Sequence, residues 1–597
     1  MATIPERIAA LRAAMEEQGV FDYIVPSADE HLNEYLPRWR GRREFMSGFD
    51  GSAGDLLIGR DDAWLYADGR YHLQAETQLA NTGVQLMRVG TAGAKGLVAH
   101  LEERARKHPG LVVGIDPMAV PLQFAENLRR RIERHGASLR EVSGNLVDPI
   151  WTDRPEPVRS QLLALPPHWT GRTATEKVDD IREDLKKVDA ESVAVVKLDQ
   201  IAWLLNLRSH DDIPYNPVFE SFLYLDRESV HLFLRGADAR LPNDVEAVPG
   251  LSVHEYADWA PFVSNASGKV VVDPAGTTLG VASALEAAGC DVHRMLSPLE
   301  RRKAHKNPVE QDAMIRANLR ASVAKTRALL WLKRAVAAGG CVTESGFRDK
   351  IESLYREQED YFGLSFNTIA ATGRNAAIIH YGECDETPLE AGHLFLIDSG
   401  AHIAGGTTDD TRTVAVGTCD GESKKVYTLV LKAHINAARQ TIPDGAGGAA
   451  LDALCRAPMW NAGLNYDHGT GHGVGAFLCV HEGPFAIAEK ERRQNATHPL
   501  SAGIISSIEP GYYRPGWGGV RIENLYLYRQ LDAGPDGRKW LQLDPVTWIP
   551  FDPALIDDTL LETPERQWIA WYHGECVKRL SPHLPDDERA ELEALVS

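Results

Sequence analysis

The feature that most constrains this chain is a run in which every second residue is glycine. It reads His-Gly-Thr-Gly-His-Gly-Val-Gly over residues 468–475, and a further histidine, His481, follows shortly after. Alternate glycines make a poor helix, so His468 and His472 do not fit the helical H-E-x-x-H metal motif. Their spacing does not fit a dinucleotide-binding loop either. Either something must approach this backbone closely, or it is a glycine-rich loop with incidental histidines.

The bulk composition limits the class of protein. A length of 597 residues predicts about three or four domains. A net charge of −20 argues against nucleic acid or an anionic membrane as the main partner. The seven scattered cysteines include no C-x-x-C pair, which indicates reduced thiols in a cytoplasmic protein. No signal peptide is evident, and no apolar run is long enough to span a membrane.

Apolar patterning predicts α/β and α+β domains. Residues 1–148 alternate helix and strand, with a strand pair over 54–59 and 63–66 joined by the turn at 60–62. Residues 149–305 partly repeat this arrangement, with strands at 222–225 and 230–234, which suggests a duplicated unit. A third domain over 306–597 begins at Asn307-Pro308-Val309-Glu310, a strong helix start.

Two aspartates stand next to predicted strands of this third domain. Asp398 ends the apolar run 394–397, and Asp409 precedes the strand 411–416. Asp398 fits either a turn-forming residue in Asp-Ser-Gly or a metal ligand. If the two strands pair through Gly405 and Gly406, the carboxylates come side by side, and a cation between them removes the repulsion.

Two glutamates have a similar placement. Glu509 ends the apolar run 503–508, and Glu523 lies among apolar neighbours in Val-Arg-Ile-Glu-Asn. Each could instead be an ion-paired residue at the edge of the core, with Arg521 as partner. Together with His472, however, the four carboxylates balance two divalent cations, which makes their burial tolerable. Mostly oxygen ligands with one nitrogen favour Mn²⁺, and Co²⁺, Fe²⁺ or Zn²⁺ can replace it in vitro.

These residues, in this order, resemble the ligand series of the pita-bread metallopeptidases, the group that contains methionine aminopeptidase, prolidase and aminopeptidase P. The five ligands fall in the contexts LIDSG, TTDDTRT, HGTGHGVG, SIEPGYY and VRIEN. Motifs such as VPSADEHLNEY, SGFDGSAG, ADGRYHLQAE, WLLNLR and PYNPVF extend the resemblance to the three-domain, cytosolic type of aminopeptidase P. The resemblance implies two creatinase-like α/β domains followed by a pita-bread catalytic domain.

Two residues depart from the pattern of that family. Asp410 places a second carboxylate beside Asp409, where such subgroups often have an apolar residue. Alternation along a strand should point the Asp410 side chain away from the metals, so Asp409 remains the expected ligand. Ser507 replaces a residue that is often acidic in relatives. Neither departure removes a metal ligand.

The resemblance also implies roles for the metal ligands. Asp398 is the chelating ligand, Asp409 and Glu523 bridge the two metals, and His472 and Glu509 complete one of them. A metal-bridging hydroxide attacks the carbonyl carbon before proline, and Glu509 carries the proton towards the leaving nitrogen.

Residues outside the ligand set are implied in substrate contact. His380 and His481 resemble family histidines that stabilise the tetrahedral intermediate. Selection of proline needs a shaped pocket, for which His468 and Tyr381 are candidates, and Arg70 matches a position implicated in substrate contact. The expected function is release of the residue before proline from small proline-containing peptides. The alternatives are a prolidase and, less favoured, a non-catalytic pita-bread binding module. C-terminal aromatics (Trp548, Trp568, Trp571, Tyr572) suggest a homodimer interface, although a core explains them equally well.

Overall fold

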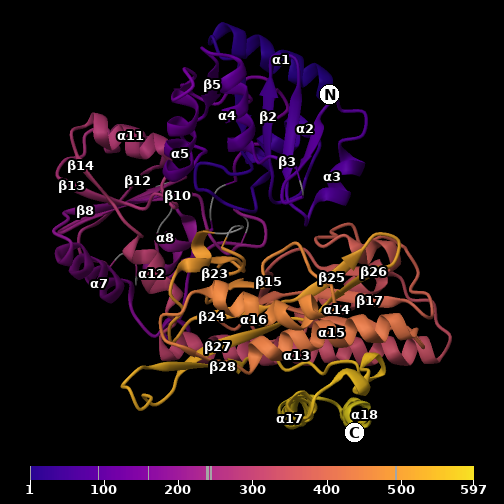
Figure 1. The fold of residues 1–597 in the computed structure, drawn as a ribbon. Helices are drawn as coiled ribbons and strands as arrows, with labels where there is room; N and C mark the ends of the chain where they lie inside the picture. Colours follow the sequence, from indigo (N-terminus) through magenta and orange to yellow (C-terminus); the bar gives the residue numbers. More distant parts are fainter. Residues whose placement is uncertain are drawn as a thin grey trace. The chain divides into compact units, whose positions relative to one another are not determined.

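The computed structural model describes residues 2–91, 93–158, 161–210, 212–236, 241–242, 245, 247–490 and 494–597. The chain divides into two compact units (Figure 1). The first contains Met1–Leu165 and Arg172–Arg301, and the second contains Pro166–Gly171 and Arg302–Ser597. Within the described part of the chain, no helix has both the length and the apolar character that a membrane crossing requires.

The first unit contains two six-stranded sheets with the same strand order. The order is β4-β3-β2-β1-β5-β6 in one and β12-β11-β10-β8-β13-β14 in the other. The first sheet consists of β1 (Asp22–Val25), β2 (Asp55–Gly59), β3 (Ala63–Ala67), β4 (Gln85–Arg88), β5 (Val112–Ile115) and β6 (Ser138–Glu141). The second consists of β8 (Ser192–Val195), β10 (Ser221–Asp226), β11 (Val230–Leu234), β12 (Leu251–Glu255), β13 (Lys269–Val272) and β14 (Asp291–Arg294). The repeat that the sequence suggested is therefore a duplicated α/β unit.

Both predicted hairpins are confirmed. β2 pairs antiparallel with β3, and β10 pairs antiparallel with β11. In each sheet the strand that comes first in the sequence, β1 or β8, pairs antiparallel with one neighbour and parallel with the other. Helix α1 (Ile4–Glu17) begins with a capping box at Thr3 and buries Ile8, Leu11 and Met15, which lie on one face.

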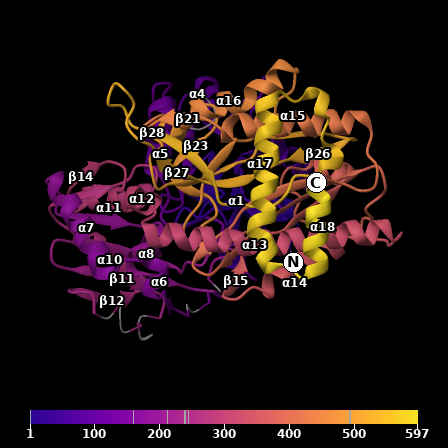
Figure 2. The same ribbon diagram turned by 90° about the horizontal axis from the view of Figure 1, so that it is seen from below.

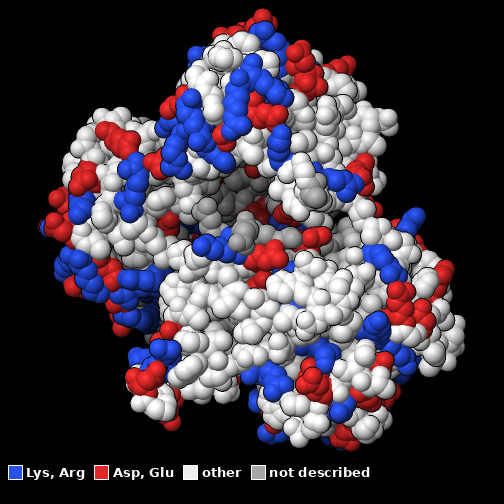
Figure 3. Space-filling view, viewed as in Figure 1, with Lys and Arg blue, Asp and Glu red and all other residues white. Residues whose placement is uncertain are grey.

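Basic side chains gather on one face of the first unit despite the acidic net charge. They lie over α4 (Leu97–Lys107) and α5 (Leu122–Glu133), as Figure 3 shows. The nearly buried Glu102 accepts ion pairs from Arg106, Arg131 and Arg134 at 2.7, 3.0 and 2.9 Å. One carboxylate thus draws three arginines together, and part of this positive charge is compensated internally.

The second unit is built around the long helix α13 (Pro308–Ala337). Asn307 caps it by accepting hydrogen bonds from the amides of Val309 and Glu310, and the Glu310 carboxylate completes the capping box. This confirms the predicted helix start. α13 is packed against the hairpin of β18 (Ala401–Ile403) and β19 (Gly406–Thr407), so one helix supports the strands that follow Asp398.

Two sheets of the second unit carry the acidic and histidine residues. A three-stranded antiparallel sheet has the order β16-β17-β20, and a six-stranded sheet has the order β21-β28-β27-β24-β22-β23. The first consists of β16 (Ile369–Thr372), β17 (Leu394–Ser399) and β20 (Asp410–Ala415). The second consists of β21 (Thr441–Pro443), β22 (Gly471–Gly473), β23 (Glu482–Ile487), β24 (Ile505–Ile508), β27 (Asn524–Gln530) and β28 (Trp540–Pro545).

Further helices, among them two packed pairs, cover this unit. α15 (Gly421–Ala438) packs on α16 (Gly448–Asn461), while α17 (Thr563–Leu580) and α18 (Asp586–Val596) lie side by side across α13 (Figure 2). Among the C-terminal aromatics, Trp548 and Tyr572 are 4% and 0% exposed and belong to the core. Trp571 is 47% exposed, so a core position does not explain it.

Candidate metal centre

The strand ends bring the predicted ligands together. β17 pairs antiparallel with β20, and Asp398 lies opposite Thr411 while Ser399 lies opposite Asp410. This is the pairing that the sequence predicted across Gly405 and Gly406, which form the β18–β19 hairpin. The five side chains lie on β17 (Asp398), directly before β20 (Asp409), on β22 (His472), directly after β24 (Glu509) and directly before β27 (Glu523).

Hydrogen bonds join the two sheets at these residues. The Glu523 amide donates to the Thr411 carbonyl at 3.1 Å, and the Thr411 hydroxyl donates to Glu523 Oε2 at 2.7 Å. The guanidinium of Arg412 donates to the Glu523 carbonyl at 2.7 Å. The ends of β20 and β27 are therefore fixed against each other, and a carboxylate from each sheet faces the same space.

The ligand atoms form a compact group. Asp409, His472 and Glu523 each offer an atom, and these atoms all lie within 4.8 Å of one another. His472 Nε2 lies 3.4 Å from Asp409 Oδ2 and 3.6 Å from Glu509 Oε1. His472 Nδ1 donates to the Gly473 carbonyl at 3.0 Å in the tautomer that leaves the Nε2 lone pair directed at the carboxylates.

The site concentrates negative charge in a buried place. Burial, followed by the charges of neighbouring carboxylates, raises the pKa of Asp409 and of Glu523 well above the ordinary range. Burial also raises the pKa of Glu509. Asp398 Oδ1 is buried without a hydrogen-bond donor in the described structure. These groups fit divalent cations, which would neutralise the carboxylates and occupy the free oxygen.

A buried arginine balances part of this charge. Arg521 Nη2 donates to Asp398 Oδ2 at 2.7 Å, and Nη1 donates to the Tyr513 hydroxyl at 2.8 Å. The Tyr513 hydroxyl lies 3.0 Å from His468 Nε2. Arg521 thus donates its hydrogen bond to Asp398 and not to Glu523, which is beside it in sequence, and through Tyr513 it links that ligand to His468.

The glycines serve the packing of the sheet. A Cβ on Gly471 would lie 2.1 Å from the carbonyl oxygen of Ser507, and one on Gly473 would lie 2.6 Å from that of Glu482. The sequence suggested that glycines admit a ligand near the backbone, but here the close neighbours are the adjacent strands. Ser507 also accepts a hydrogen bond from the His472 amide at 3.1 Å through its hydroxyl.

A second buried arginine organises the glycine-rich run from behind. Arg456, on α16, pairs with Asp452 at 2.9 Å and donates to the carbonyls of Tyr466 at 2.8 Å and His468 at 2.6 Å. Asp452 also accepts from the Thr470 hydroxyl at 2.6 Å. The Thr470 carbonyl in turn accepts from the Glu509 amide at 2.7 Å. Nothing in the local sequence around Arg456 indicated this function.

Of the two expected catalytic histidines, His481 lies beside a candidate ligand. The His481 ring stands perpendicular to that of His472, with a centroid separation of 4.4 Å. The next residue, Glu482, is buried and pairs with Lys303 at 2.7 Å and with Lys306. His380 follows Ile379, whose carbonyl accepts from Arg521 Nη1 at 3.4 Å.

The expected substrate contacts have different environments. His468 Nδ1 lies 3.9 Å from Glu509 Oε2, so this side chain borders the ligand group. Tyr381 is 4% exposed, and its hydroxyl lies 3.1 Å from the amide of Asn375, which also donates to Glu344. Tyr381 is therefore committed to an internal network. Arg70, in the first unit, pairs with Asp68 at 2.8 Å, and its substrate contact stays a prediction.

Comparison with known families supports this description of the fold. The model of metallopeptidase family M24 matches residues 312–530, and that of the C-terminal region of this family matches 539–595. Two models of the creatinase/prolidase N-terminal domain match residues 7–149 and 153–310. These matches define the class as an M24 metallopeptidase with two creatinase-like domains.

Individual relatives narrow the class. The chain is 38% identical to a protein named Probable Xaa-Pro aminopeptidase P from Paracoccidioides brasiliensis, over 98% of this chain and 97% of the relative. A protein of the same name from Laccaria bicolor is 36% identical over 98% and 92%. An X-prolyl aminopeptidase from Caenorhabditis elegans, described as a cytosolic enzyme with a di-nuclear active site, matches with a TM-score of 0.94 and 33% identity over 100% of both chains. The chain belongs to metallopeptidase family M24, in the three-domain aminopeptidase P branch.

Proposed function

We propose that this protein is an Xaa-Pro aminopeptidase, which releases the N-terminal residue from peptides with proline in the second position. The observation that carries the proposal is the convergence of four carboxylates and His472 from two sheets into one buried group. The relatives over the full length of the chain carry the name Xaa-Pro aminopeptidase, which favours this activity over that of a prolidase.

The ligands would hold two divalent ions. Asp398, Asp409, His472, Glu509 and Glu523 would hold them. When bound, such ions lower the pKa of a shared water and polarise the carbonyl of the scissile bond. Mn²⁺ suits the donor set of carboxylate oxygens and one imidazole nitrogen, and Co²⁺, Fe²⁺ or Zn²⁺ are the substitutes to test.

The chain supplies the proton transfer and the orientation. Glu509 has the most exposed side chain among Asp398, Asp409, His472 and itself, at 20%, so it can reach both a water molecule and the substrate nitrogen. Its carboxylate would take a proton from water and return it to the leaving proline nitrogen. His481 and His380 would donate hydrogen bonds to the substrate carbonyl as its negative charge grows. His468 would border the proline, and Arg70 would contact substrate.

The experiment compares two peptides under metal control. The purified chain is treated with EDTA, assayed on Arg-Pro-Pro and on Gly-Pro, and assayed again after Mn²⁺ is added. We expect the tripeptide to be cleaved only with metal. Cleavage of the dipeptide alone would identify a prolidase, and no metal binding with no hydrolysis would favour a binding module. A Glu509→Gln variant, which keeps the shape of the side chain, should lose about 10²–10⁴-fold in kcat.

Location and assembly follow from the same features. Free cysteines, of which Cys341 is exposed, and the cytosolic C. elegans relative favour the cytoplasm. A homodimer is consistent with the exposed Trp571 on α17. Light scattering of the purified protein measures its mass in solution. If the Trp571→Ser variant stays dimeric, the dimer interface does not depend on Trp571.

A further inference from the structure

A fully buried ion pair lies directly behind the two aspartate ligands. Lys325, on α13, contacts the carboxylate of Asp410, and the two side chains are 0% and 1% exposed. Asp410 is the residue at which the sequence departs from the apolar choice common in such subgroups. The structure supplies the missing explanation, because a lysine on a helix 85 residues away in sequence provides the matching charge.

The Lys325 ammonium also holds the backbone on both ligand strands. It donates to the carbonyl of Ser399 at 3.3 Å and to the carbonyl of Asp410. Ser399 and Asp410 face each other in register, and each directly follows a ligand, Asp398 or Asp409. The Ser399 hydroxyl is held in turn by the Tyr355 hydroxyl at 2.9 Å. The Lys325 ammonium therefore bridges β17 and β20 at the end where the two strands separate.

The electrostatics of the site favour Lys325 and Asp410 together over either residue alone. An ammonium without Asp410 would place an uncompensated positive charge behind a site for cations. A carboxylate without Lys325 would add a further negative charge to a group whose ionised members already repel one another. Paired, the two side chains are neutral, and the lysine keeps its hydrogen bonds to the backbone.

We propose that Lys325 and Asp410 form a positioning pair that sets the separation of Asp398 and Asp409 and thereby the affinity for the metal ions. Neither residue touches the metals or the substrate. The inference rests on the proposed metal centre and adds the residues that hold its geometry. Groups that orient metal ligands typically change metal affinity by about 10–100-fold when they are removed.

The test is a double-mutant cycle read by metal affinity. The full-length protein is stripped of metal, and Mn²⁺ binding to the parent, Lys325→Met, Asp410→Val and the double variant is measured by titration against a chelator. We expect each single variant to bind at least about tenfold more weakly. We expect the double variant to stay at least about tenfold weaker than the parent, because the ammonium that bonds the carbonyls of both ligand strands is still absent.

Whether Lys325→Met raises or lowers the affinity for Mn²⁺ distinguishes a positioning effect from an effect of charge alone. If the pair acted only through its charge, removal of the ammonium would tighten cation binding. Tighter or unchanged binding in Lys325→Met, or a double variant that binds Mn²⁺ as the parent does, would overturn the proposal. If a single variant does not fold, Lys325→Arg and Asp410→Asn replace it, and the arginine variant should retain most of the affinity. KM for peptide should change less than metal affinity, because neither residue contacts substrate.

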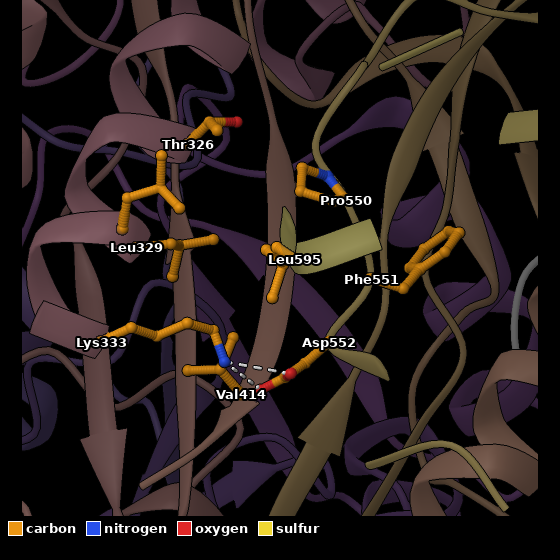
Figure 4. Close-up of a pocket in the computed structure, with 9 residues that line it drawn as sticks. Thr326, Leu329, Lys333, Val414, Pro550, Phe551, Asp552 and Leu595 are labelled. Atoms are coloured by element: carbon orange, nitrogen blue, oxygen red, sulfur yellow. Dashed lines mark hydrogen bonds and ion pairs between the residues drawn. The ribbon is translucent and has the colours of Figure 1, made fainter. Parts of the chain in front are cut away.

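The matched control lies on the same helix. Lys333 pairs with both oxygens of Asp552 at 3.0 Å, beside a small pocket that Leu595 and Phe551 help to line (Figure 4). This pair does not contact the ligand strands at their ligand ends. Lys333→Met should bind Mn²⁺ as the parent does, and an equal loss in this control would assign the effect to general destabilisation. Absence of binding in the parent would instead refute the metal centre itself.

Discussion

Arg456→Met tests whether the glycine-rich run depends on its buried anchor. The change leaves the Asp452 charge buried, with the Thr470 hydroxyl as a remaining donor, and removes the donor from the carbonyls of Tyr466 and His468. Breaking a buried ion pair from one side costs about 3–5 kcal/mol. An unsatisfied buried carbonyl costs about 1–3 kcal/mol. The two costs do not add, because the same local rearrangement of the chain relieves both. We expect the free energy of unfolding to fall by about 4 kcal/mol.

The measurement must resolve the second unit from the first. A chain with two compact units does not unfold as one two-state system, so urea unfolding is followed by hydrogen exchange of peptides from residues 302–597. Arg439→Met, at an exposed arginine that ends the neighbouring helix α15, is the matched control and should change stability by about 0.5 kcal/mol or less. Because the run carries His472 and holds the Glu509 amide, Mn²⁺ affinity should also fall. A change below about 1 kcal/mol with unaltered metal binding would refute the reasoning.

Three further changes address other parts of the site. Burial raises the pKa of Glu344 to about 7, from 4.5. Because the folded protein holds this proton more tightly than the unfolded chain does, the free energy of unfolding falls by about 2–3 kcal/mol as pH rises from about 4.5 to 7. Glu344→Gln should remove this loss, so the difference in unfolding free energy between pH 5 and pH 8 should become smaller. Gly471→Ala places a methyl group 2.1 Å from the Ser507 carbonyl oxygen, and we expect a loss of about 3 kcal/mol or more, measured by thermal unfolding. His481→Ala should lower kcat on Arg-Pro-Pro by about 10²–10³-fold while Mn²⁺ titration shows full occupancy; equal losses of both would make His481 a structural residue.

The parts of the site that the sequence revealed are those with a local signature. Asp398 and Glu509 each end an apolar strand, and Glu523 interrupts one, so the unusual placement of charge was visible without knowledge of the fold. The capping box at Asn307 was equally local, and α13 begins there. The pairing of β17 with β20 followed from a short connection with glycine at its turn. Short-range patterns of this kind predict both elements and candidate ligands.

The partners of those ligands had no such signature. Arg521 stands two residues from Glu523 in sequence, but its guanidinium binds Asp398, which lies 123 residues away. Lys325 and Asp410 are 85 residues apart, and although Asp410 departs from the family pattern, nothing in the sequence indicated Lys325 as its partner. Tyr381 follows a candidate catalytic histidine, yet its ring is buried against Glu344. Long-range pairing of this kind depends on tertiary packing that periodicity does not encode.

In the glycine-rich run, the structure requires glycine for a different physical reason from the one that the sequence suggested. Glycine was expected because a peptide must pass close to the backbone, but Gly471 and Gly473 are needed because the carbonyls of β24 and β23 lie too close for a Cβ. β22 is therefore held tightly between its two neighbours. Since His472 lies on β22, His481 directly before β23 and Glu509 directly after β24, one tightly packed group of strands positions a metal ligand, a candidate substrate contact and the candidate proton carrier. We therefore propose that side chains such as His468 select proline, because a Cβ at Gly471 or Gly473 would already meet a neighbouring strand.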